Sequence, residues 1–72
     1  NPSNGIFNIQ INKFFGKISL RVTDLNGRVV YAENEASFNS SKEINLSHLQ
    51  SGMYIINVEA DQLSFSKKII KN

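Results

Sequence analysis

The chain has 72 residues and a mass of 8.1 kDa, which allows one small domain. It contains no cysteine and one histidine, which excludes a disulfide framework, a cysteine-ligated metal and a histidine-rich metal cluster. Eight basic and six acidic residues leave a net charge of +2, a mild excess that differs from the basic stripe of a nucleic-acid-binding surface.

Apolar and polar residues alternate in short segments along the chain, a pattern typical of half-buried strands. The composition agrees, because β-branched and aromatic residues are frequent and alanine is rare: nine Ile, four Val and five Phe against three Ala. In chain order the pattern predicts strands at residues 6–12, 18–23, 28–33, 42–46, 53–59 and 63–71, with a brief seventh strand if residues 36–40 pair.

Turn-forming residues separate these strands. Residues 1–5 are expected to form the first turn and residues 13–17 the next one. The segment 47–52 predicts a single helical turn that Ser47 begins and Gly52 ends. No apolar run approaches the roughly 20 residues that cross a bilayer, and no signal peptide is expected in this fragment.

Strands at this spacing predict an all-β fold, a small antiparallel sandwich or barrel of six to seven strands in a single domain, residues 1–72. The side chains expected to point inward lie on one face of each strand: Ile9, Ile11, Leu20, Val22, Ile44, Leu46, Tyr54, Ile56 and Val58.

The hairpin at residues 24–28 allows two registers. A two-residue turn would place Leu20 opposite Glu33, a poor match on a buried face. A three-residue loop that ends on Gly27, in the left-handed region, would pair Leu20 with Ala32 instead. The aspartate that begins this loop could then accept hydrogen bonds from the following amides and face the arginine that ends it. We therefore expect the three-residue loop.

The sequence shows no arrangement of residues that is typical of a catalytic site. His48 is the only histidine, and its neighbour Ser47 is expected to cap a turn rather than act as a nucleophile. The carboxylates are scattered or committed to turns, and the four glycines do not form a phosphate-binding loop. We expect no enzyme activity, no catalytic residue, no metal and no cofactor.

Exposed aromatic side chains leave one binding function open. A carbohydrate- or cell-surface-binding accessory module would stack sugars on surface rings, and the candidates are Phe14, Phe15, Tyr31 and Phe38. The competing interpretation is that these rings fill the ends of a small sandwich. The role of the segment Lys67-Lys68-Ile69-Ile70-Lys71 also has two interpretations. Its lysines can protect an edge strand from aggregation, or they can belong to a recognition strand.

Four segments, in order and together spanning the chain, resemble the motifs of one family. They are Asn1-Pro2-Ser3-Asn4-Gly5-Ile6-Phe7, Val22-Thr23-Asp24-Leu25-Asn26-Gly27-Arg28-Val29-Val30, Leu46-Ser47-His48-Leu49-Gln50-Ser51-Gly52-Met53-Tyr54 and Lys67-Lys68-Ile69-Ile70-Lys71. Their order and spacing resemble the C-terminal sorting domains, type A, of the type IX (Por) secretion system.

The resemblance implies an immunoglobulin-like sandwich that serves as a secretion signal. It implies a domain at the C-terminus of a larger secreted protein, a cargo domain before it in the same chain, and export to the surface or exterior of a Gram-negative cell through the periplasm and outer membrane. The expected partners are the type IX translocon and sortase-type components, the latter removing the signal. No nucleic acid and no transmembrane segment are expected, and the domain is expected to be a monomer.

The resemblance also implies which residues carry the recognition motifs. They are Pro2, Gly5, Phe7, Asp24, Gly27, Arg28, Gly52, Tyr54, Lys67, Lys68 and Lys71. The accessory β-sandwich module described above remains the alternative to the sorting signal.

Overall fold

A computed structural model describes residues 2–60 and 63–72, with the side chains of residues 2, 3, 12–15, 35 and 36 left out of the description. The described chain is all-β, as expected. In chain order the strands are β1 (Pro2–Ser3), β2 (Ile6–Thr23), β3 (Val29–Asn45), β4 (Gly52–Ala60) and β5 (Leu63–Lys71).

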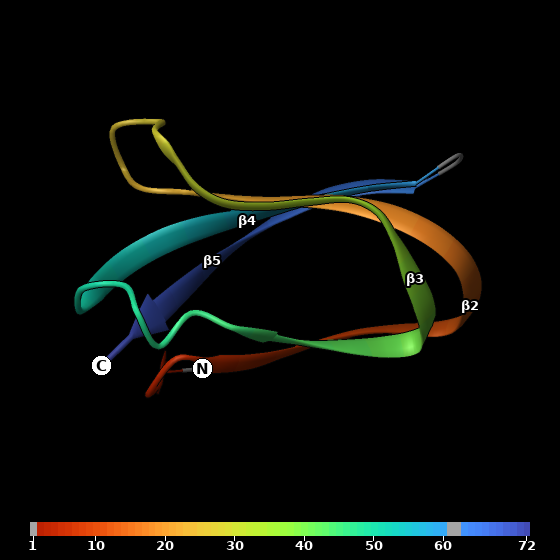
Figure 1. Ribbon diagram of the computed structural model, residues 1–72, viewed down its shortest axis with the longest axis horizontal. Coiled ribbons are helices and arrows are strands. Elements are labelled where there is room, and N and C mark those ends of the chain that lie inside the picture. The colour runs from red at the N-terminus through yellow and green to blue at the C-terminus, as the bar shows by residue number, and fades with distance from the viewer. Residues whose placement is uncertain (1, 61–62) are drawn as a thin grey trace.

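The five strands form one sheet that folds over itself into a sandwich. The strand order is β1-β5-β4-β2-β3, with antiparallel pairing except for the short parallel pair of β1 and β5. In Figure 1, β4, β5, the second half of β2 and the first half of β3 form one layer. The first half of β2 and the second half of β3 form the other layer. This arrangement is consistent with a small immunoglobulin-like β-sandwich.

The long strands β2 and β3 explain how the expected strand segments become four continuous strands, and the fifth strand, β1, lies within the turn that was expected at residues 1–5. Two expected segments lie in β2 and three lie in β3, including residues 36–40. The turn expected at residues 13–17 is wrong in detail, because this backbone stays in β2 and bends from one layer to the other. The ladder is interrupted there, between Gln10 and Phe15, so the extra residues of β2 take up the bend.

The core lies between the two layers and follows the alternation in the sequence. Of the nine side chains expected inside, eight are buried, and Ile11 is partly buried and packs against them. The same faces also bury Phe7, Ile18 and Ile69. Phe38 is 3% exposed, which removes it as a candidate surface ring; it fills the core near the bend, opposite Gly16.

The register predicted for the hairpin is correct next to the turn and wrong further along the strands. Next to the turn, Thr23 pairs with Val29, as the three-residue loop requires. A bulge at Val30 then shifts the ladder by one residue, so that Leu20 pairs with Glu33 rather than with Ala32.

The shifted register is tolerated because β3 is the edge strand of both layers, where the inner face opens to water. The Tyr31 hydroxyl donates a hydrogen bond to Oε1 of Glu33. Nζ of Lys42, from the other layer, lies 3.3 Å from Oε2 of Glu33. This polar group at the open side of the sandwich replaces the apolar partner that the sequence favoured for Leu20, and it links the two layers.

Candidate functional site

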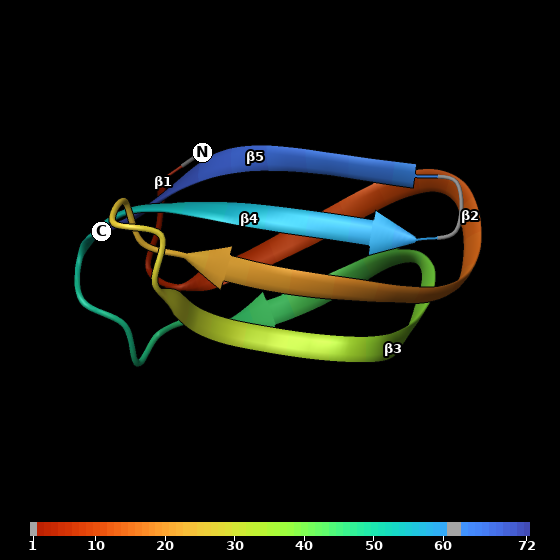
Figure 2. The same cartoon turned by 90° about the horizontal axis from the view of Figure 1, so that it is seen from above.

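The turns of the first three motif segments and the last residues of the fourth meet at one end of the sandwich. Figure 2 places the N-terminal turn, the loop between β2 and β3, the loop between β3 and β4 and the C-terminus at the same end. Backbone pairing joins the first motif to the last, since Pro2 lies opposite Ile70, and joins the third to the last, since Gly52 lies opposite Lys71. We call this end, built from residues 2–5, 24–28, 46–52 and 70–72, the motif end.

Gly5 joins the first motif to the third by a close backbone approach. Its carbonyl accepts a hydrogen bond of 2.6 Å from the Leu46 amide. A Cβ at this position would lie 2.6 Å from Cα and 2.7 Å from the amide nitrogen of Ser47, and the backbone has a φ of 126°. Only glycine fits both the space and the angle, so the motif requires Gly5 for a structural reason.

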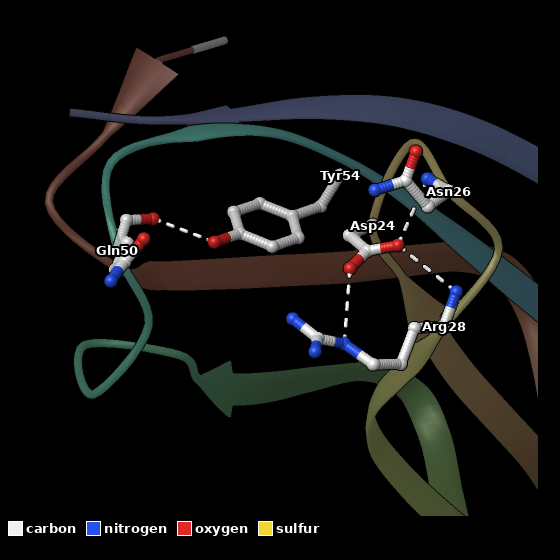
Figure 3. A network of polar contacts seen from close by, with 5 residues as sticks. All are labelled: Asp24, Asn26, Arg28, Gln50 and Tyr54. Carbon is white, nitrogen blue, oxygen red and sulfur yellow. Dashed lines mark hydrogen bonds and ion pairs between the residues drawn. The ribbon is translucent and has the colours of Figure 1, made fainter.

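Asp24 organises the turn between β2 and β3 (Figure 3). Its Oδ1 accepts hydrogen bonds of 2.9 Å from the amides of Asn26 and Arg28, and its Oδ2 lies 3.2 Å from Nε of Arg28. Gly27 has a φ of 85°, as the three-residue loop requires. The Arg28 amide, aided by the Asn26 amide and the Arg28 charge, lowers the pKa of the Asp24 carboxyl below its usual 3.8.

The loop between β3 and β4 differs from the expected helical turn. The Leu49 amide donates to the Leu46 carbonyl at 3.0 Å, which closes a single turn without continuing into a helix. Ser47 does not cap it. Instead Oδ1 of Asn45 accepts hydrogen bonds of 2.9 Å from the Ser47 amide and 2.6 Å from the Ser47 hydroxyl. Gly52 is the first residue of β4.

Tyr54 holds this loop against the sandwich. Its ring is buried in the core, and its hydroxyl donates a hydrogen bond of 2.7 Å to the Gln50 carbonyl, four residues upstream (Figure 3). The ring and the hydroxyl thus serve different parts of the molecule, the core and the loop. The tyrosine of the third motif has a structural role in shaping the motif end.

A groove of about 460 Å³ separates the two loops of the motif end. The turn with Asp24, Leu25 and Arg28 forms one wall, and the loop with His48 and Gln50 forms the other. The side chain of Arg28 is 80% exposed, so a positive charge remains available at the rim although its Nε contacts Asp24. His48 is exposed, as expected for a solvated loop residue.

The residues expected to carry recognition fall into two groups by position. Buried positions shape the motif end, and exposed positions are available to a partner. The buried group contains Gly5, Phe7 and Tyr54, while Gly27, Arg28, Gly52, Lys67 and Lys68 are exposed and Asp24 and Lys71 are half-exposed. Lys67 lies opposite Ile56 in the middle of β5, away from the groove. The side chain of Pro2 lies outside the described residues.

Sequence reasoning missed Leu25 and Met53, exposed apolar residues inside the second and third motifs that line the groove. A signal was present for Leu25, which interrupts a polar turn with a large apolar side chain, and for Met53, which falls on the face of its strand opposite the buried Tyr54. The sequence also did not reveal that four distant motifs meet. That proximity follows from the bend in β2, which returns the chain to the end where it started.

The described residues offer little for chemistry. Within residues 2–60 and 63–72, no group of three or more His, Cys, Asp or Glu side chains lies together as metal ligands would. That same part of the chain contains no helix of the length and apolarity needed to cross a bilayer. Of the four candidate stacking rings, Phe38 is buried and Tyr31 is bonded to Glu33, while Phe14 and Phe15 lie outside the described side chains.

The protein is a small β-sandwich in which segments distant in the sequence form one surface, the motif end. A family model described as "Secretion system C-terminal sorting domain" matches residues 1–72, the whole chain. The chain belongs to this family and is a C-terminal sorting signal for type IX secretion, as the motifs predicted. The family is not an enzyme family, and its role implies a secreted or cell-surface cargo. No curated protein matches the chain significantly.

Proposed function

We propose that this domain acts as a folded address that the outer-membrane translocon of the type IX system recognises at the motif end, and that a sortase-type peptidase removes from its cargo. The observation that supports this proposal is the meeting of all four family motifs at one end of the sandwich. A recognised surface needs its parts side by side, and here segments that are far apart in the sequence form one exposed surface.

The division of labour within the motifs supports the same proposal. Gly5 and Tyr54 hold the loops in place through a close approach and a hydrogen bond. Beside this loop, the turn that Asp24 organises presents the exposed charge of Arg28 and the exposed apolar side chain of Leu25. Rigidly held surface groups bind a partner with a smaller loss of conformational entropy than mobile ones.

The test is to fuse residues 1–72 to the C-terminus of a fluorescent protein that carries a periplasmic signal peptide, and to express the fusion in a Gram-negative host with a type IX system. We expect fluorescence at the cell surface or in the medium. The same reporter without the domain, and the fusion in a host that lacks the translocon, should both stay in the periplasm. Export that does not depend on the domain or on the translocon would contradict the proposal.

The same experiment tests removal of the signal. Mass spectrometry of the exported reporter should find the reporter without residues 1–72, and a host that lacks the sortase-type peptidase should yield the intact fusion. An exported reporter that keeps the domain in the complete host would contradict proteolytic removal while leaving the sorting role intact.

A further inference from the structure

Large apolar side chains are exposed on the outer face of the four-stranded layer, next to the motif end. Five large apolar side chains of the described chain are 37% exposed or more. Val29 (49%), Met53 (40%) and Ile70 (37%) lie on this face, and Leu25 (64%) lies in the adjoining turn. The fifth, Ile6, lies on the other layer, opposite Asn45.

The pairing of the strands makes Met53 and Ile70 direct neighbours and places Val29 on the same face. Met53 of β4 lies directly opposite Ile70 of β5, and residues directly opposite on paired antiparallel strands point to the same face. One row further along, Thr23 pairs with both Val29 and Ile55. Leu25 lines the same groove as Met53 and so extends the first row across the turn. We call the surface formed by Leu25, Val29, Met53, Ile55 and Ile70 the apolar patch.

Basic side chains border the apolar patch. Lys68 is opposite Ile55 and therefore shares the outer face, and Arg21 is opposite Asn57 in the next row. Both are exposed. Asp24, the acidic group of the adjoining turn, is engaged by two amides and by Arg28. Glu59, opposite Ser19 on the same face, lies one row beyond Arg21 and is further from the patch than Lys68 and Arg21. The patch therefore has an apolar centre and a positive border.

We propose that the apolar patch is the docking surface of this sorting signal, and that it binds a protein surface with an apolar centre and acidic side chains around it. This inference rests on the proposed function and names the face that a protein receptor touches. Apolar centres with charged rims are the usual anatomy of protein interfaces, and opposite charges at the rim set orientation and association rate.

Two other occupants fit the patch less well. A second copy of this chain, packed through the same face, would bring one positive border against another. A membrane rich in anionic lipid is bound through clusters of four to eight basic residues, whereas Lys68 and Arg21 are only two. An acidic protein surface satisfies both the apolar centre and the border.

The apolar part of the proposal is tested with the fluorescent fusion in the type IX host. The variant Leu25→Ser/Met53→Ser removes two exposed apolar side chains, and the control Leu63→Ser removes a partly exposed one opposite Ala60, at the end of β5 away from the motif end. We expect the exported fraction of the patch variant to fall by about tenfold or more, because central apolar side chains dominate interface energies, and the control to export like the wild type. Thermal unfolding of each purified fusion establishes that the domain is folded.

The charged part is tested with Lys68→Glu and the control Lys17→Glu. Lys17 is also exposed but lies opposite Ser37, at the bend end of the molecule. Reversing the charge at Lys68 should lower export several-fold, and reversing it at Lys17 should not. If the double serine variant does not fold, this pair carries the test alone, because both lysines are exposed and tolerate substitution.

The outcomes separate the docking surface from the sorting function. Export of the wild-type fusion with unchanged export of the patch variant or of Lys68→Glu would overturn the docking surface and leave the sorting function standing. Retention of the wild-type fusion in the periplasm would overturn both. Binding of the purified domain to phosphatidylglycerol vesicles, or a patch-dependent dimer in sedimentation, would overturn the choice of an acidic protein partner.

Discussion

The carboxylate of Asp24 and the backbone of Gly27 together determine the turn that presents Arg28. The carboxylate accepts two amide hydrogen bonds, which it can do fully only when ionised, so its pKa is lowered in the folded state. A lowered folded-state pKa means that this contribution to stability is present above the unfolded pKa, near 3.8, and is lost as the pH falls through the folded-state value. The turn is therefore complete at neutral pH.

The substitution Gly27→Val should destabilise the domain by about 1–3 kcal/mol, because a β-branched residue is strained at positive φ. The φ here is 85°, and a Cβ would meet no atom within 4 Å, so the loss would come from the backbone rather than from a clash. Thermal unfolding of the purified domain measures it. Gly27→Asn, which tolerates this region, should lose less. An unchanged midpoint in the valine variant would contradict the turn geometry.

Polar contacts on the inner face of the sandwich join the first half of the edge strand β3 to its second half, which lies in the opposite layer. The hydroxyl of Tyr31 donates to Glu33, and Lys42 pairs with the same carboxylate. Inward-facing charges at an edge also discourage pairing with another chain, so the same group limits aggregation along β3. One set of side chains thus holds the layers together and protects an edge.

The hydrogen bond to Glu33 raises the pKa of Tyr31 to about 12. A raised folded-state pKa stabilises the fold below the unfolded value, near 10, and this contribution is lost as the pH rises from about 10 through about 12. We therefore expect the free energy of unfolding to fall more steeply across this range in the wild type than in Tyr31→Phe.

Urea denaturation at a series of pH values from 8 to about 12 measures this difference. Glu33→Gln is the matched variant, since it replaces the carboxylate whose hydrogen bond and charge raise the tyrosine pKa while keeping the phenol, and it should flatten the curve in part. Parallel curves for the wild type and Tyr31→Phe above pH 9 would contradict the role of this hydrogen bond.

The whole molecule separates a buried interior from an end that collects the family motifs. The bend of β2 and β3 stacks the layers and also returns the chain to its starting end, so both properties come from one feature. The short parallel pair of β1 and β5 covers only Ile70 and Lys71 of the last strand. Along the edge away from β4, most of β5 pairs with no other strand of the described chain, and Lys67 and Lys68 lie in that unpaired part.

The double variant Lys68→Gln/Lys71→Gln separates edge protection from recognition. Neither lysine takes part in an ion pair among the described residues, so the free energy of unfolding should stay within about 0.5 kcal/mol of the wild type. Export of the fused reporter should fall, because Lys68 borders the apolar patch. The measurements are thermal unfolding and the exported fluorescence. Normal export of a folded double variant would assign these lysines to edge protection alone.

The sequence by itself determined most of the strand residues, their inward faces and the turn at Asp24. Side chains in a strand alternate between two faces, so a period of two identifies the buried face of each segment without knowledge of its partner. That rule placed Val22, Ile56 and Val58 in the core. The Asp24 turn was equally predictable, because its hydrogen bonds span only four residues.

Only the tertiary structure decided the features that depend on distant partners. The bulge at Val30 pairs Leu20 with Glu33, and this is favourable only because Lys42, from the other layer, reaches the edge. The burial of Phe38 likewise depends on the bend, and the approach of Gly5 to Ser47 depends on where both strands end. Local propensity carries no information about such contacts, since their energy comes from residues far apart in the chain. The motif end is one of them, and its four segments become a single surface only when the sandwich closes.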